Sequence, residues 1–257
     1  KSEGPIKSLI AETGGQNAMF VDSSSLKEQV IDDVIRSAFY SSGQRCSALR
    51  VVFVQEDIAQ EYWEYLNEAM QEIKVGDPQK PCTDIGPIIN KSSISKLQDH
   101  VAKLKKQGKE FIETKEEFDK QTFFMNPIAF KIDSIKEIDG EKFGPVLHFI
   151  SYKTSHLDNL INEINATGFG LTMGVHSRIL DKAKQIFDKA NVGNFYLNRD
   201  IVGAVVGVQP FGGQGLSGTG PKAGGPNYLK SFVTEKTFTD NVMATGGNID
   251  LLNKNNQ

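Results

Sequence analysis

The stretch NAMFVDSSSLKEQVIDDVIRSAFYSSGQRCSALRVVFV, residues 17–54, decides the fold class. It opens with a short apolar run, 17–21, of the kind that forms a buried strand. From Leu26 to Phe39 the apolar residues then recur with a helical period. A second apolar run, Arg50–Val54, predicts another buried strand. Strands that alternate with helices in this way predict an α/β fold with a parallel sheet and helices on both faces.

The same alternation continues along the chain. Helices are expected at about 58–73, 92–106, 157–164 and 183–190, and strands at about 123–132, 146–152, 171–176 and 192–197. Residues 103–120 are rich in lysine and glutamate, so most of that stretch is expected to be a solvated face or loop. A final extended segment is expected at about Tyr228–Phe238.

Composition excludes several functional classes. The chain has 257 residues and a formal net charge of -3, which argues against nucleic-acid binding. No apolar run approaches the roughly 20 residues that span a bilayer. Two cysteines in this length fit a reducing compartment, so we expect a cytoplasmic protein. The sequence starts without methionine or a signal peptide, and we expect it to be a piece of a longer protein.

Two residues with reactive side chains lie next to predicted strands. Cys46 lies in a polar segment between a helix and a strand, where Arg45 could favour its thiolate and where catalytic residues accumulate. A small buried hydrophobe is the alternative reading of Cys46. Glu12 precedes two glycines that permit close backbone approach, although the local sequence by itself favours an ordinary surface glutamate. Cys82 lies in a turn and is interpreted as incidental.

Two other patterns are weighed and set aside. GQGLSG at 213–218 matches a dinucleotide-binding pattern, but the prolines at 221 and 226 prevent the helix that this motif requires, so we predict a shaped loop. The four histidines are dispersed and lack ligand spacing with either cysteine, so no metal site is predicted. A Cys–His hydrolase dyad stays open, because such partners meet only in the fold.

Four motifs taken together carry a family resemblance. They are ETGG at 12–15, GQRC at 43–46, EKFGP at 141–145 and PFGG at 210–213. In this order and spacing they resemble the aldehyde dehydrogenase superfamily, which implies its α/β catalytic domain and a C-terminal oligomerisation strand. CSALR at 46–50, GAVVG at 203–207, GLSGTGPK at 215–222 and TGGNIDLL at 245–252 are most similar to its L-glutamate γ-semialdehyde (1-pyrroline-5-carboxylate) dehydrogenase branch, particularly the C-terminal module of bifunctional proline utilisation (PutA) proteins.

The resemblance implies a catalytic pair. Cys46 would be the nucleophile that adds to the aldehyde, forming a thiohemiacetal and then a thioester. Glu12 would be the general base that activates water to hydrolyse the thioester, releasing L-glutamate in proline catabolism.

The resemblance also implies the binding residues. Glu141, Phe143 and Thr13 would contact NAD. Ser47, Gly203, Ala204 and Phe211 would bind the semialdehyde, because oriented N–H groups and a hydroxyl suffice for its α-carboxylate. FAD is expected only if the parent protein carries a proline dehydrogenase domain.

The domain organisation is likewise implied by the family. Residues 1–10 would end a nucleotide-binding region, 11–210 would form the catalytic domain, and 211–257 would hold the substrate loop and the oligomerisation segment. Most of the NAD site would lie in the preceding domain, together with an oxyanion donor whose loss typically costs about 10²–10³ in rate. We therefore expect the isolated chain to be inactive.

Three alternative functions remain open. A succinic or other aliphatic semialdehyde dehydrogenase would differ in the anchors Ser47, Gly203 and Ala204. A non-catalytic oligomerisation module would pair through its final extended segment. A thiol hydrolase would need a histidine beside Cys46.

Overall fold

A seven-stranded sheet forms the centre of the structure, a computed structural model that describes residues 4, 7–118, 123–205 and 207–241. The strand order is β3-β4-β5-β2-β1-β7-β8. The strands are β1 Asn17–Val21, β2 Leu49–Gln55, β3 Phe111–Glu113, β4 Ile128–Lys131, β5 Val146–Tyr152, β7 Thr172–His176 and β8 Asn194–Leu197. Neighbours pair in parallel except β3 and β4. The expected α/β fold with a parallel sheet is confirmed.

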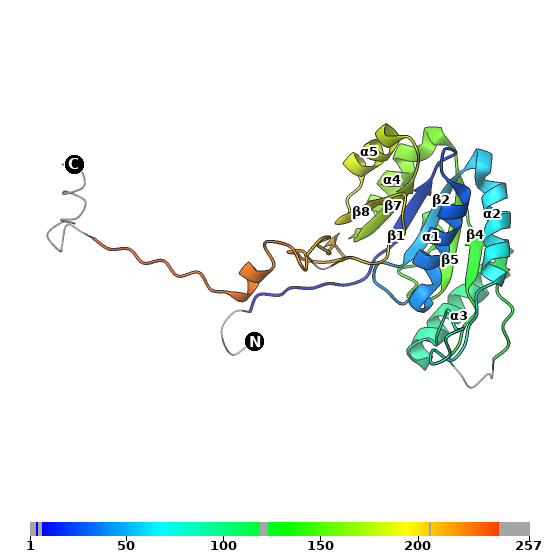
Figure 1. Cartoon of the computed structure of the whole chain (residues 1–257), viewed down its shortest axis with the longest axis horizontal. Coiled ribbons are helices and arrows are strands. Elements are labelled where there is room, and N and C mark those ends of the chain that lie inside the picture. Colours follow the sequence, from blue (N-terminus) through cyan, green and yellow to red (C-terminus); the bar gives the residue numbers. More distant parts are fainter. Residues whose placement is uncertain (1–3, 5–6, 119–122, 206, 242–257) are drawn as a thin grey trace.

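Helices cover both faces of this sheet (Figure 1). One face carries α1 Lys27–Phe39 and α2 Glu56–Gln71, and the other carries α3 Lys91–Lys106, α4 Leu157–Asn165 and α5 Leu180–Lys189. Short 3-10 helices lie at Tyr40–Gly43, Ile135–Glu137, Thr154–His156 and Leu229–Phe232. The result is a three-layer body.

Alternate residues of the central strands feed two separate cores. Phe20 of β1 stacks on Phe53 of β2, with ring centroids 4.8 Å apart, in the core under α3, α4 and α5. The neighbouring Met19 and Val52 point into the other core, under α1 and α2. This period of two explains why these strands are apolar throughout, since both faces are buried.

One expectation about the edge of the sheet was wrong. The charged stretch 103–120 was expected to be a solvated face or loop, but it contains the short strand β3, which pairs antiparallel with β4. Phe111 packs on Phe130 with ring centroids 5.6 Å apart, and the ammonium of Lys105 lies 4.4 Å from the Phe111 ring centroid. A strand of three residues is too short to show a period in the sequence.

The glycine-rich region leaves the body as an arm. Gln214–Gly215 forms β9, which pairs with β6, Phe169–Gly170, and no helix follows Gly218 until the 3-10 turn at Leu229. The rejection of the dinucleotide pattern is therefore confirmed. Residues 7–11 and 218–241 project together from one side of the body (Figure 1).

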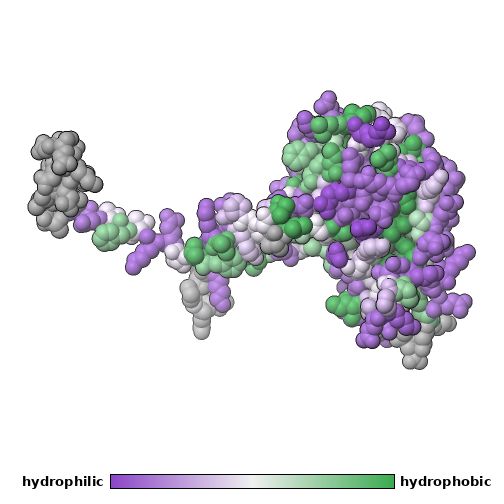
Figure 2. Space-filling model, in the orientation of Figure 1, coloured by the Kyte–Doolittle hydropathy of each residue, from purple (hydrophilic) through white to green (hydrophobic). Residues whose placement is uncertain are grey.

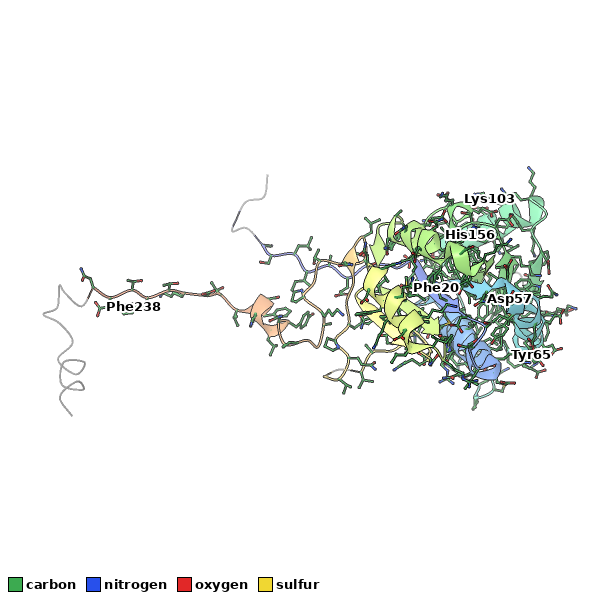
Figure 3. The ribbon with its side chains drawn as sticks, turned by 90° about the horizontal axis from the view of Figure 1, so that it is seen from above. Phe20, Asp57, Tyr65, Lys103, His156 and Phe238 are labelled. Carbon is green, nitrogen blue, oxygen red and sulfur yellow. The ribbon has the colours of Figure 1, made fainter. Side chains whose placement is uncertain are left out.

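The end of this arm differs from the sequence expectation. Tyr228–Phe238, expected to be extended throughout, begins with the 3-10 turn Leu229–Phe232, and 233–241 follow without regular structure. Apolar side chains lie exposed along the arm, and Phe238 lies far from the body (Figures 2 and 3). The motif at 245–252 lies outside the described residues.

Among the described residues, no helix is long and apolar enough to span a membrane.

Candidate active site

Cys46 lies on the turn that leads into the amino end of β2. The buried side chain of Asn17, the first residue of β1, donates to the carbonyl oxygens of Cys46 at 2.7 Å and of Ala48 at 2.9 Å. Its Oδ1 accepts the N–H of Thr172 at 3.1 Å. One amide therefore fixes the Cys46 turn against β1 and β7. The sequence analysis missed Asn17, whose one visible signal is a polar residue that opens an apolar strand.

Glu12 lies at the same end of the sheet, in the segment before β1. Because β1 and β2 are parallel neighbours, the residues that precede the two strands lie together at the amino-terminal end of the sheet. Glu12 forms an isolated bridge with Gly218, and a Cβ built on Gly212 would lie 2.9 Å from Glu12 Oε1. Next to it, the Thr13 N–H donates to the Ser217 carbonyl oxygen at 3.1 Å, and its hydroxyl donates to Leu216. The C-terminal glycine loop thus packs against the predicted base.

Glu141 contacts the glycine pair that follows Glu12. Its Oε1 accepts the Gly15 N–H at 2.9 Å. A Cβ on Gly14 would lie 1.8 Å from Glu141 Oε2, so any larger residue there would displace the carboxylate. The Glu141 carboxylate also lies 3.6 Å from the Arg50 guanidinium. The predicted base segment and the predicted cofactor carboxylate are therefore in direct contact.

Cys46 lies close enough to Glu12 and Glu141 for their charges to affect its ionisation. Burial is the main factor that raises the pKa of the half-buried Cys46 thiol, and the charges of Glu12 and Glu141 raise it further. The expectation that Arg45 favours the thiolate is not met, because the pKa of Cys46 is raised and Arg45 is not among the groups that shift it. The Arg45 guanidinium instead donates to Ser41 Oγ at 2.9 Å. Burial likewise raises the pKa of Glu12.

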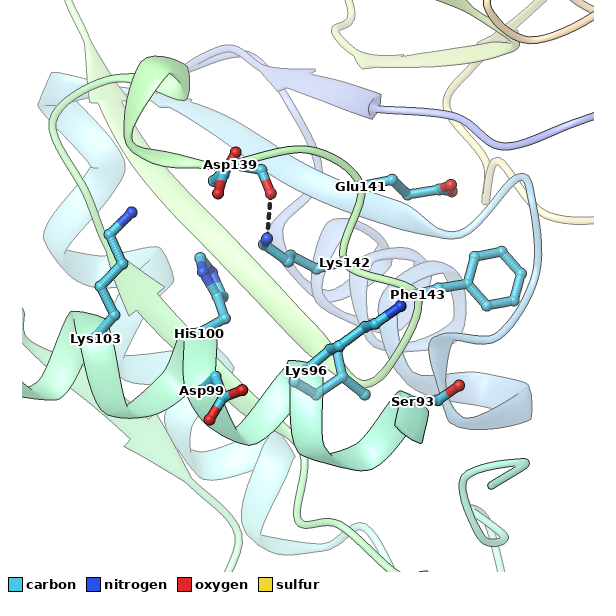
Figure 4. Close-up of a pocket in the computed structure, with 10 residues that line it drawn as sticks. Ser93, Lys96, Asp99, His100, Lys103, Asp139, Glu141, Lys142 and Phe143 are labelled. Atoms are coloured by element: carbon cyan, nitrogen blue, oxygen red, sulfur yellow. Dashed lines mark hydrogen bonds between the residues drawn. The ribbon is translucent and has the colours of Figure 1, made fainter. Parts of the chain in front are cut away.

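Phe143 lines an open pocket beside this group. The pocket measures about 520 Å³ and lies between the loop that carries Glu141 and Phe143 and helix α3 (Figure 4). The Phe143 ring is 41% exposed, and its centroid lies 5.2 Å from the Arg50 guanidinium carbon. Its lining residues are Ser93, Lys96, Leu97, Asp99, His100, Lys103, Asp139, Glu141, Lys142 and Phe143. Glu141 and Phe143 thus border this pocket from its loop side, and their side chains point away from His100 and Lys103 (Figure 4).

The predicted substrate residues are placed less tightly. Ser47 is buried beside Cys46. Gly203 has φ 102, a conformation that favours glycine, and its loop returns toward the Cys46 end of α1, where the Ile201 N–H donates to Ser37 Oγ at 3.1 Å. Among the described residues no hydrogen bond joins Gly203 or Ala204 to Ser47. Phe211 is fixed by paired backbone bonds with Ala223, of 3.0 and 2.8 Å.

The remaining cysteine and the histidines have hydrogen-bond partners or exposure that do not involve Cys46 or Glu12. Cys82 is free and exposed. His100 and His148 bond to each other, with a Nε2–Nε2 distance of 2.9 Å, and His148 Nδ1 bonds to the Arg50 carbonyl oxygen at 2.9 Å. His176 Nε2 lies 3.4 Å from Asp33 Oδ2. Among the described residues no group of three potential ligands could hold a metal ion.

Comparison with known proteins gives concordant matches. The profile of the Aldehyde dehydrogenase family matches residues 1–238. The "Bifunctional protein PutA" of Escherichia coli strain K12 is 50% identical over 235 residues, covering 89% of this chain and 18% of its own. A crystal structure of Bradyrhizobium japonicum proline utilization A superposes with a TM-score of 0.88 at 48% identity, over 95% of this chain and 25% of that one.

A monofunctional relative is also similar. The structure of 1-pyrroline-5-carboxylate dehydrogenase from Thermus "with bound NAD" gives a TM-score of 0.79 at 31% identity, over 87% of this chain and 43% of its own. The chain thus spans about a fifth of the length of the curated PutA relatives and less than half of the monofunctional one.

Proposed function

The chain belongs to the aldehyde dehydrogenase family, and on that premise we propose that it is the catalytic half of an enzyme that oxidises L-glutamate γ-semialdehyde to L-glutamate with NAD. The observation that carries the proposal is the meeting of Cys46, Glu12 and Glu141 at the amino ends of β1 and β2. A thiol and a carboxylate beside each other suit nucleophilic attack followed by base-assisted hydrolysis.

In this proposal the Cys46 sulfur adds to the aldehyde carbon and forms a thiohemiacetal. Bound NAD would supply the acceptor for hydride from that carbon, and with loss of the hydroxyl proton an acyl-thioester would remain on Cys46. Glu12 then takes a proton from the water that attacks the thioester. Its raised pKa makes Glu12 a stronger base than an ordinary glutamate. It also brings the pKa nearer to the working pH, where a general base is most effective.

The residues around the open pocket fit the nicotinamide end of NAD. Glu141 has a partly exposed carboxylate that could accept hydrogen bonds from ribose hydroxyls. The half-exposed ring of Phe143 could pack on a flat heterocycle in the same pocket. Thr13, held by the glycine loop, lies in the segment next to Glu141 and would help to orient the carboxamide.

The substrate's α-carboxylate would be bound by Ser47 with the backbone of Gly203 and Ala204, and Phe211 would pack on its aliphatic stem. The left-handed φ of Gly203 supports this, since such a backbone can aim an N–H group at an anion. Succinic semialdehyde carries its carboxylate one carbon nearer to the aldehyde and has no α-amino group, and simple aldehydes carry no carboxylate. A Ser47→Ala variant of the parent should therefore lose its preference for glutamate semialdehyde over simple aldehydes.

The exposed arm supports a role in assembly. Leu229, Phe232, Val233 and Phe238 are 65–89% exposed, which suits contact with a second copy of the chain. Two free cysteines fit a protein of the reducing cytoplasm. A Cys–His hydrolase is disfavoured, because the charged groups that shift the Cys46 pKa are Glu12 and Glu141, while His100 and His148 are bonded to each other.

Rapid mixing of the full-length parent with NAD and the semialdehyde tests the proposal. Cys46→Ser should abolish NADH formation. Glu12→Gln should still give a burst of about one NADH per site and then stall, because acylation precedes the step that needs the base. Glu64→Gln, an exposed glutamate of α2, is the matched control and should turn over normally. Steady turnover by Glu12→Gln would refute the assigned base.

A further inference from the structure

Arg50 is a fully buried guanidinium at the start of β2, and its hydrogen bonds go to two loops of the proposed active site. Nη1 donates to the carbonyl oxygens of Gly43 at 2.7 Å and Gly144 at 3.3 Å. Nη2 donates to the Arg45 carbonyl oxygen at 3.0 Å and lies 3.6 Å from Glu141 Oε1. One side chain therefore joins the turn before Cys46 to the loop that carries Glu141 and Phe143.

The turn that Arg50 holds has an unusual backbone. Ser41, Ser42 and Gly43 have φ values of 55, 57 and 61 in succession. Side-chain-bearing residues rarely adopt this left-handed conformation, so contacts from outside the turn must maintain it. Ser42 Oγ donates to the Gly86 carbonyl oxygen at 2.7 Å, and Arg45 Nε donates to Ser41 Oγ at 2.9 Å.

The turn also presses directly on the second loop. A Cβ on Gly43 would lie 2.2 Å from the Gly144 carbonyl oxygen, the same oxygen that accepts from Arg50. Two backbones this close would repel through their carbonyl dipoles without a donor between them. Arg50 Nη1 supplies that donor to both oxygens while Nη2 donates to the Arg45 carbonyl oxygen, and a single ammonium group could not place a nitrogen at both positions.

We propose that Arg50 is a positioning residue of the proposed dehydrogenase. It locks the left-handed turn before Cys46 onto the Glu141–Gly144 loop, so that the nucleophile and the cofactor-binding carboxylate keep one fixed separation. The inference rests on the proposed function of these loops. Arg50 acts through Gly43, Arg45, Gly144 and Glu141 and itself touches neither substrate nor cofactor.

The test compares Arg50→Lys with Leu66→Ala in the full-length parent. Leu66 is a residue of α2 and is buried in the core between α1, α2 and the sheet. Its truncation should lower the melting temperature without disturbing either loop. Two quantities are measured in each protein. The first is the KM for NAD, compared with kcat. The second is the rate at which iodoacetamide alkylates Cys46 in the absence of cofactor, measured at several pH values by mass spectrometry of the Cys46 peptide.

Arg50→Lys should raise the KM for NAD at least tenfold and speed Cys46 alkylation at least fivefold, because the loosened turn exposes the thiol. Leu66→Ala should change neither quantity. If Arg50→Lys matches Leu66→Ala in both, Arg50 is only a core residue and the inference is overturned.

Two further arms keep the outcome decisive. If Arg50→Lys does not fold, Ser42→Ala removes another bond that holds the same turn and should shift both quantities in the same direction. An unchanged Ser42→Ala would then overturn the inference. If the wild-type parent makes no NADH from the aldehyde, the proposed function fails, while the alkylation comparison still decides whether Arg50 holds the turn.

Discussion

Glu12, the proposed general base, has a raised pKa. A carboxyl group whose pKa is raised stays protonated to higher pH, so its action as a base is lost as pH falls through that raised value. We expect the acid limb of kcat in the parent to have its midpoint above 4.5, the ordinary glutamate value. Glu12→Asp should keep this limb at a lower rate. If the slow remaining deacylation of Glu12→Gln showed an acid limb with the same midpoint as the wild type, the ionisation would belong to another group.

Gly14 is a position where we expect a side chain to weaken NAD binding. Gly14→Ala would place a Cβ 1.8 Å from Glu141 Oε2 and force that carboxylate away from its bond with Gly15. We expect the KM for NAD of the parent to rise about tenfold, equivalent to about 1.4 kcal/mol of binding, with a smaller change in kcat. Gly76→Ala is the control, since its Cβ would meet only Thr83 Oγ1, at 3.4 Å. Equal effects of the two variants would contradict this role.

At this scale the sequence identified the residues that we propose take part in the chemistry, but it missed the residues that hold the surrounding backbone in place. Cys46, Glu12 and Glu141 stand in motifs with a recognisable order. Asn17 and Arg50 bond mainly to backbone carbonyls, and those carbonyls come together only when β1, β2 and the distant 141–144 loop are folded. Nothing in the residues next to Asn17 or Arg50 shows these partners.

The attachment of α3 to the sheet depends on a neutral histidine pair. The Arg50 carbonyl accepts from His148 Nδ1, so His148 Nε2 must accept from His100 Nε2, and both rings are uncharged. Burial is the main cause that lowers the pKa of His100 to about 4 and of His148 to about 3. The unfolded chain takes up these protons near pH 6.5, so the pair's contribution is complete above 6.5 and is lost as pH falls toward 4.

Stability should therefore fall between pH 6.5 and 4.5, by at most about 1.4 kcal/mol per pH unit for each histidine. His100→Gln keeps an N–H donor for His148 and cannot titrate, so it should show a shallower dependence. The exposed His156→Gln should behave as wild type. Urea unfolding of the chain, followed by the fluorescence of Trp63, its single tryptophan, gives the free energies of unfolding. Parallel pH curves for wild type and His100→Gln would contradict this account.

Elements with a clear period were predicted, whereas short elements were not. The helix from Leu26 to Phe39 is confirmed as α1, Lys27–Phe39, since its apolar spacing follows the buried face. The strand β3 was missed because its three residues are held by pairing with β4 and by contacts such as Phe111 on Phe130. Tertiary pairing decided that segment, and local sequence does not show it.

At the scale of the whole molecule, the exposed arm is the feature that packing within the sheet and its helices does not account for. Leu229, Phe232, Val233 and Phe238 are 77, 65, 71 and 89% exposed, and they lie on a segment that projects from the sheet (Figures 1 and 3). Exposed apolar residues gathered on one segment are typical of an interface between subunits. Pairing of the arm with a second copy would remove these side chains from water, at about 25 cal/mol for each Å² that becomes buried.

We therefore expect the chain to form oligomers that depend on the arm. Changing Phe232, Val233 and Phe238 together to serine should lower the molar mass measured by light scattering to that of a monomer, because each change removes apolar area from the contact. Leu180→Ser is the matched control, since Leu180 is 55% exposed but lies on α5 of the body. The wild-type chain should remain associated at micromolar concentration. A wild-type chain that is monomeric throughout, or a triple variant of unchanged mass, would remove the arm from assembly and leave its apolar residues to another contact.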